Sequence, residues 1–160
     1  MRAPELTTLC YLERDGAYLM LHRNRKKEDV NAGKWIGVGG HFEPNESPED
    51  CMKREIHEET GLTVTSWRFR GIVTFLTDGG ICEYMHLFTC DVWQGEEIPC
   101  DEGDLAWVEK SRIPSLPLWE GDRIFLDLIA RNAPFFSLKL SYRGDRLVSA
   151  ELDGNPLAVG

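Results

Sequence analysis

Three glutamates, Glu55, Glu58 and Glu59, lie within a stretch of five residues. Because each residue of an α-helix turns about 100° around the axis, Glu58 would project about 60° to one side of Glu55 and Glu59 about 40° to the other. A helix would therefore present all three carboxylates on one face. Clustered carboxylate oxygens on a rigid face are typical ligands of hard divalent cations such as Mg²⁺ and Mn²⁺.

The same segment also fits a solvent-exposed acidic face held by salt bridges along the helix. Oppositely charged residues stand four apart in three pairs: Glu49–Lys53, Asp50–Arg54 and Arg54–Glu58. Glu55 and Glu59, however, have no cation at helical spacing on their own side. Helix geometry by itself leaves both interpretations open, a solvated face and a metal site.

A glycine-rich stretch before this segment, WIGVGG, favours the metal site. The pair Gly39-Gly40 allows the backbone to approach a bound ion closely, so a peptide carbonyl can add another hard oxygen ligand. Metals that proteins hold with few groups keep several waters and usually bind phosphorylated substrates. These residues indicate metal-assisted phosphoryl chemistry.

Capping signals at both ends predict the helix that carries the glutamates, from Pro48 to Thr60. Ser47 can cap the first turn, Pro48 suits the first helical position, and the acids that follow favour the positive end of the helix dipole. Gly61 can take the left-handed conformation that ends a helix.

Alternating apolar residues predict strands on both sides of this helix. We expect a hairpin over 6–13 and 17–24, strands at 63–77, 81–93 and 105–109, and a closing hairpin that turns at Gly144-Asp145. A second, amphipathic helix is expected over 118–132, before Pro134. The basic stretch at 23–34 is expected to be a mobile loop. This order predicts a single domain over 1–160 with an α+β fold and a mixed or largely antiparallel sheet.

The composition limits the kinds of partner. The 160 residues, 42% hydrophobic and 28% charged, are typical of one globular domain. A net charge of −9 disfavours long nucleic acids and anionic membranes, but not a small phosphorylated ligand screened by metal ions. The five cysteines form no CxxC pair, and no segment resembles a signal peptide or a membrane span, so we expect reduced thiols and a cytoplasmic protein.

The segment from Gly40 to Leu62 resembles the Nudix box. Gly40 is followed by five residues, Glu46, seven residues and then REIHEETGL, which matches the specified positions of that signature. The resemblance implies an α/β/α sandwich with a mixed central sheet and a C-terminal β-hairpin. It also implies hydrolysis of a nucleoside diphosphate linked to another moiety. The remaining chain, through GKWIGVGGHFEPNES and LWEGDRIF, is similar to MutT-type hydrolases of oxidised purine nucleoside triphosphates such as 8-oxo-dGTP.

Several site residues are implied by this resemblance. Arg54 would orient a glutamate, and Glu46 would brace the junction between loop and helix. Glu55 is the first candidate for the base that activates water, and Glu102 is the second, although Glu102 also fits an exposed loop acid. The products would be a nucleoside monophosphate and pyrophosphate. The implied ligands of Mg²⁺, or of Mn²⁺, are the Gly39 carbonyl with Glu55, Glu58, Glu59 and Glu102.

Trp119 and Asp122 match positions that face the purine in similar enzymes. An indole can stack on a base, and a carboxyl group can meet its polar edge. Trp119 also fits core packing, and Asp122 also fits an acid near a helix start. Further candidates for substrate contact are Thr8, Arg23, Thr74 and Glu83.

Two positions depart from the pattern of similar eukaryotic enzymes. Ile36 stands where these often carry asparagine, and Gly121-Asp122 stands where they pair two aspartates. Hydrolysis is therefore better indicated than a preference for oxidised guanine. Other Nudix substrates stay open: an undamaged nucleoside triphosphate, a dinucleoside polyphosphate, ADP-ribose or a capped RNA. A nucleotide sensor without catalysis is a further alternative. The expected partner is a small nucleotide, bound by a monomer or homodimer.

Overall fold

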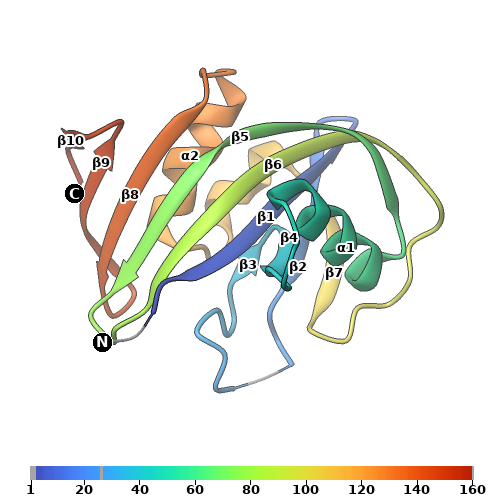
Figure 1. Ribbon diagram of the computed structural model, residues 1–160, viewed down its shortest axis with the longest axis horizontal. Helices are drawn as coiled ribbons and strands as arrows, with labels where there is room; N and C mark the ends of the chain where they lie inside the picture. Colours follow the sequence, from blue (N-terminus) through green and yellow to red (C-terminus); the bar gives the residue numbers. More distant parts are fainter. Residues whose placement is uncertain (1–2, 26, 160) are drawn as a thin grey trace.

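One mixed β-sheet separates two helices that lie on its opposite faces (Figure 1). The computed structural model describes residues 3–25 and 27–159. Its elements are β1 (Glu5–Arg14), β2 (Ala17–His22), β3 (Trp35–Ile36), β4 (Val38–His41), α1 (Pro48–Thr60), β5 (Thr63–Thr77), β6 (Cys82–Gln94), β7 (Asp104–Glu109), the 3₁₀ helix η1 (Lys110–Ser115), α2 (Glu120–Ala130), β8 (Phe136–Arg143), β9 (Arg146–Leu152) and β10 (Asn155–Leu157).

The strands follow the order β10-β9-β8-β5-β6-β1-β2-β3, with β4 paired to β1 and β7 paired to β2. Two neighbouring pairs, β1 with β6 and β5 with β8, are parallel, and the other pairs are antiparallel. The structure thus confirms the mixed sheet, the α/β/α sandwich and the C-terminal hairpin of β8 and β9. No helix in the described residues is long and apolar enough to cross a membrane.

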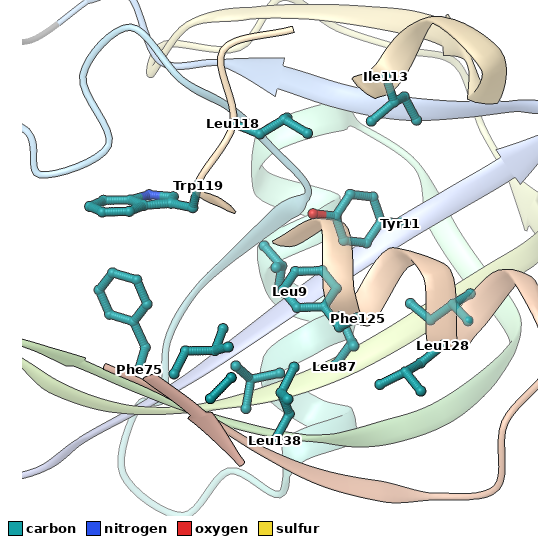
Figure 2. Close-up of a cluster of buried hydrophobic side chains, with 14 of the residues drawn as sticks. Leu9, Tyr11, Phe75, Leu87, Ile113, Leu118, Trp119, Phe125, Leu128 and Leu138 are labelled. Atoms are coloured by element: carbon teal, nitrogen blue, oxygen red, sulfur yellow. The ribbon is translucent and has the colours of Figure 1, made fainter. Parts of the chain in front are cut away.

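The alternating direction of the side chains along β1 explains why the sheet has a hydrophobic core on each face. Successive strand residues point to opposite sides. Leu9 and Tyr11 accordingly pack into the cluster that contains Phe125 of α2, and this cluster is shown in Figure 2. Cys10 and Leu12 pack into the other cluster, against α1.

The helix α1 has the predicted bounds because its end signals are local. The Ser47 hydroxyl accepts a hydrogen bond from the Asp50 N–H at 3.0 Å, and the Asp50 carboxylate accepts one from the Ser47 N–H at 3.1 Å. Gly61 ends the helix with φ 80°. This reciprocal cap satisfies two N–H groups that the first turn leaves without helical partners.

Other predicted bounds were wrong. The second helix was expected to begin at Leu118 but begins at Glu120, so Trp119 is its N-cap residue rather than a helical one. The stretch WIGVGG, for which no strand was expected, forms β3 and β4, because β4 finds hydrogen-bond partners on β1. Strand β10 was not predicted, and β2 ends at His22.

Candidate active site

The glycines before α1 allow two close approaches. Residues of β4 pair with β1, with Gly39 opposite Leu9 and Gly40 opposite Thr8. A Cβ at Gly39 would overlap the backbone of Thr8, and one at Gly40 would lie 2.5 Å from the carboxyl carbon of Glu55. Gly39 therefore has no room for a side chain, whereas a side chain at Gly40 would require Glu55 to move, and Gly40 places backbone directly against this glutamate of the helix.

Arg54 ties the loop before α1 to the helix. Its Nε lies 2.7 Å from Glu46 Oε2 and its Nη2 lies 3.0 Å from Glu46 Oε1. Nη2 also donates to the carbonyl of His41 at 2.9 Å, and Glu46 Oε1 accepts the N–H of Glu43 at 2.7 Å. The Arg54 guanidinium lowers the pKa of Glu46, so this carboxylate stays charged. The result is a bidentate clamp across the junction.

The same guanidinium positions two glutamates of α1. Nη1 of Arg54 lies 2.8 Å from Glu55 Oε1 and 3.2 Å from Glu58 Oε2. The Glu58 side chain is 56% exposed, whereas burial raises the pKa of Glu55 although Arg54 opposes that shift. Glu55 is therefore the less hydrated carboxylate of the pair.

Glu59 is buried, with only 7% of its surface exposed, and its Oε2 atom has no hydrogen-bond partner among the residues that the structure describes. Burial, and then the neighbouring carboxylate of Glu102, raise its pKa to about 9. A buried carboxylate is stable only with a proton or with a cation. An orphaned buried oxygen next to further carboxylates fits a divalent metal ion, so the residues present are compatible with the implied cofactor.

The predicted metal ligands lie near one another, but their ligating atoms do not meet at one point. Within residues 3–25 and 27–159, three metal-ligating atoms come within 4.8 Å of one another only at Glu5, His41 and Glu83. Glu102 instead pairs with Arg23, whose Nη1 lies 2.6 Å from its Oε2. Arg54 and Arg23 thus neutralise carboxylates that would otherwise repel one another.

A cavity of about 480 Å³ is lined by residues of α1, of the start of α2 and of strands that include β1 and β4. Its wall includes most of the predicted site residues: Thr8, Arg23, Gly39, Arg54, Glu55, Glu83, Glu102, Trp119 and Asp122. A volume of this size suits a small organic ligand such as a nucleotide. Glu58 and Glu59 are not part of this wall: the Glu58 side chain is exposed and Glu59 is buried.

Thr74 is not part of the cavity wall. Its neighbours Val73 and Phe75 are buried in the α2-side core, and Phe75 lines the cavity. Since strand residues alternate between faces, Thr74 points to the other face of β5. The structure therefore does not support the expectation that Thr74 contacts the substrate.

Trp119 belongs both to the core and to the cavity. The residue is 4% exposed and its Nε1 donates to Asn31 Oδ1 at 2.8 Å. The ring of Phe75 stands edge-on to the indole with centroids 5.0 Å apart, and Figure 2 shows the two side by side at one end of the cluster. Both interpretations of Trp119 from the sequence are thus compatible with its position.

Asp122 is 3% exposed and lines the cavity. Burial raises its pKa to about 8, although Arg123 and Lys34 oppose this shift. The carboxyl group is therefore mostly protonated at neutral pH, and it offers one donor and one acceptor. A neutral carboxyl group in the cavity wall can form hydrogen bonds with a nucleobase without the cost of burying a charge.

Sequence reasoning missed Asp29 and Asn31, which also line the cavity. Both residue types favour turns in which a side chain binds nearby backbone, and this signal was present in the stretch DVN. The basic residues around DVN led instead to the prediction of a mobile loop.

A family model described as NUDIX domain matches residues 3–129. The chain belongs to the Nudix family. One Nudix relative is the uncharacterized Nudix hydrolase YvcI of Bacillus subtilis, 30% identical over 152 residues that cover 91% of this chain and 92% of that protein. Another is the oxidized purine nucleoside triphosphate hydrolase of Danio rerio, 31% identical over 155 residues that cover 96% and 97%.

A solved structure of a MutT protein from Bacillus halodurans has the same Nudix fold. It superposes with a TM-score of 0.82 at 28% identity and covers 95% of this chain and 99% of that one. The family, together with relatives named as hydrolases, makes this protein a Nudix hydrolase. Nudix hydrolases generally use a divalent metal ion and act on small nucleotide substrates.

Proposed function

We propose that this Nudix hydrolase converts purine nucleoside triphosphates to the monophosphate and pyrophosphate with Mg²⁺, and that it prefers oxidised purines such as 8-oxo-dGTP. The observation that carries the proposal is that one cavity wall contains both the carboxylates Glu55 and Glu102 and the candidate base contacts Trp119 and Asp122. A nucleotide can offer its phosphates to the first pair and its base to the second, and we call these parts of the wall the phosphate end and the base end. The name of the Danio rerio relative supports this substrate class.

At the phosphate end, the residues that would hold the metal are Glu55, Glu58, Glu59 and Glu102 with the Gly39 carbonyl. Mg²⁺ bound there would neutralise phosphate charge and lower the pKa of a bound water. Glu55 would accept the proton of the attacking water, because it is half-buried and more basic than an exposed glutamate. Glu102 is the second candidate for this base. Arg23 donates a hydrogen bond to Glu102 and would meet the phosphates.

At the base end, Trp119 and Phe75 supply apolar wall and Asp122 supplies the polar contact. The adjacent carbonyl and N–H of a guanine edge match the donor and acceptor of a protonated carboxyl. Ile36 lines the same wall and offers no hydrogen bond. Recognition of the base thus depends more on Asp122 than in enzymes that have asparagine at this position, with Thr8 and Glu83 as further contacts.

The direct test is a panel of nucleotides assayed for pyrophosphate release with Mg²⁺ and again with excess chelator. We expect kcat/KM to be highest for 8-oxo-dGTP, above dGTP and well above dCTP, and release to stop when the metal is removed. Equal or lower efficiency on 8-oxo-dGTP than on dGTP would remove the preference for oxidised purines and retain the hydrolase. Nucleotide binding without any metal-dependent release would favour a sensor.

A further inference from the structure

The segment from Asp29 to Lys34 is ordered by its own hydrogen bonds, although the sequence predicts a mobile loop. Backbone bonds join Ala32 N to Asp29 O, Lys34 N to Asn31 O, Gly33 N to Arg23 O and Arg23 N to Lys34 O, at 2.7–2.9 Å. The last two close the base of the segment against the end of β2. A segment held in this way can position other groups.

Asp29 connects two of the groups that line the cavity. One carboxylate oxygen, Oδ1, accepts the N–H of Asn31 at 3.0 Å. The other oxygen, Oδ2, accepts Nε–H of Arg23 at 2.5 Å, and both side chains of this ion pair are at most 15% exposed. Since Arg23 uses Nη1 for Glu102, its guanidinium is oriented from both sides.

Asn31 continues the connection to Trp119. Its Oδ1 is 2.8 Å from Nε1 of the indole, and the indole N–H is the only donor of that side chain. Lys34 lies over the indole ring, with Nζ 4.4 Å from the centroid, and is itself paired with Asp145 at 3.2 Å. Asn31 lines the cavity, whereas Lys34 does not. Of these two polar side chains, Asn31 is therefore the one that acts on the indole from within the cavity wall.

We propose that the Asp29–Asn31 turn is a positioning element that sets Trp119 for the base and Arg23 for the phosphates, so that Asn31 determines how strongly a purine binds. This inference rests on the proposed function. Loss of the Asn31 acceptor leaves a buried N–H without a partner and frees the indole to tilt. Loss of the Asp29 charge removes one of the two carboxylates that orient Arg23.

Four substitutions separate these roles. Asn31→Leu removes the acceptor at similar volume, and Asn31→Asp keeps an oxygen for the indole. Asp29→Asn keeps an acceptor for the Asn31 N–H but loses the charge that faces Arg23, and Asp29→Ala removes both. Glu28→Ala, an exposed neighbour, is the control.

The first measurement is the indole N–H resonance of Trp119 in the ¹⁵N spectrum of the nucleotide-free protein, assigned by its absence in Trp119→Phe. We expect it to shift in Asn31→Leu and in Asp29→Ala, and to stay in place in Asp29→Asn and Glu28→Ala. It should return towards its hydrogen-bonded position in Asn31→Asp. An unchanged resonance in Asn31→Leu would overturn the proposal.

The second measurement is the affinity for the product nucleotides 8-oxo-dGMP and dCMP by calorimetry. We expect Asn31→Leu to weaken the binding of 8-oxo-dGMP by roughly 5- to 30-fold and the binding of dCMP much less. In Asn31→Asp the affinity for 8-oxo-dGMP should recover. Asp29→Asn should weaken both nucleotides equally. In turnover assays Asn31→Leu should raise KM with kcat nearly unchanged. Equal loss for both nucleotides in Asn31→Leu would overturn the role in base binding, whereas wild-type protein that binds neither nucleotide would overturn the proposed function itself.

Discussion

Arg54 holds Glu46 through two parallel hydrogen bonds, from Nε to Oε2 at 2.7 Å and from Nη2 to Oε1 at 3.0 Å. The remaining nitrogen, Nη1, reaches Glu55 at 2.8 Å. One planar side chain thus fixes both the loop before α1 and the candidate base. A lysine has a single ammonium group and cannot make this pattern.

We therefore expect Arg54→Lys to fold normally and to lose roughly 10- to 100-fold in activity or in metal affinity, as for other residues that orient metal ligands. The comparison is Arg131→Lys, which changes an exposed arginine paired with Asp127 at the end of α2. Steady-state kinetics at several Mg²⁺ concentrations would measure the effect. Equal activity of the two variants would show that the clamp does not serve the site.

Glu59→Gln should retain the fold and reduce turnover by orders of magnitude, because it removes a buried carboxylate from the proposed metal site. Glu49→Gln, on the first turn of the same helix, is the control. Circular dichroism would confirm the fold, and pyrophosphate release would measure the rate. Near-normal turnover in a folded Glu59→Gln protein would exclude Glu59 from the metal ligands.

The pKa of Glu59 also predicts how stability depends on pH in the metal-free protein. Its pKa rises from 4.5 to about 9 on folding, so between these values the folded state keeps a proton that the unfolded state loses. The free energy of unfolding should fall as pH rises through this window. Glu59→Gln has no such proton, and its stability should decrease less from pH 5 to pH 8. Urea unfolding at each pH would measure the difference.

The two glycines of β4 should respond differently to alanine. At Gly39 the new Cβ meets the backbone of Thr8, which cannot move aside, and we expect a loss of more than about 2 kcal/mol of stability. At Gly40 it meets the end of the Glu55 side chain, which can turn away. Gly40→Ala should therefore remain folded and lose activity. A fully active Gly40→Ala protein would contradict the placement of Glu55.

Asp122 should make base recognition sensitive to alkaline pH. Its carboxyl is protonated below a pKa of about 8 and charged above it. We expect KM for 8-oxo-dGTP to rise above pH 8 in the wild-type protein. Because an amide does not titrate in this range, the Asp122→Asn variant should keep a KM that is independent of pH between 7 and 9. Steady-state kinetics across this range would measure both profiles, and the same rise of KM in the variant would assign the effect to another group.

The Asp122 carboxyl group should also make the folded protein less stable as pH rises. The pKa of Asp122 rises from 3.8 to about 8 on folding, so the wild-type protein loses stability as pH rises between these values. In Asp122→Asn the free energy of unfolding should fall less over this pH range. An identical pH profile of unfolding in the two proteins would contradict the burial of a neutral carboxyl.

Local signals account for the parts of the fold that the sequence predicted best. The bounds of α1 matched at both ends because the Ser47–Asp50 cap and Gly61 lie directly at the helix ends that they determine. The start of α2 was misplaced because Leu118 and Trp119 continue the apolar pattern of that helix. Their positions are instead set by packing, since Trp119 contacts Phe75 and Tyr142 on β5 and β8.

The sequence by itself determined the Nudix box, the helix that presents its glutamates and the α+β order of the strands, because caps, turns and periodicity act over a few residues. Only the tertiary structure decided that Asn31 meets Trp119, 88 positions away, and that Thr74 faces away from the cavity. These outcomes depend on which strands pair and in which register. A shift of one residue reverses the face of every side chain on a strand, and no local pattern encodes that choice.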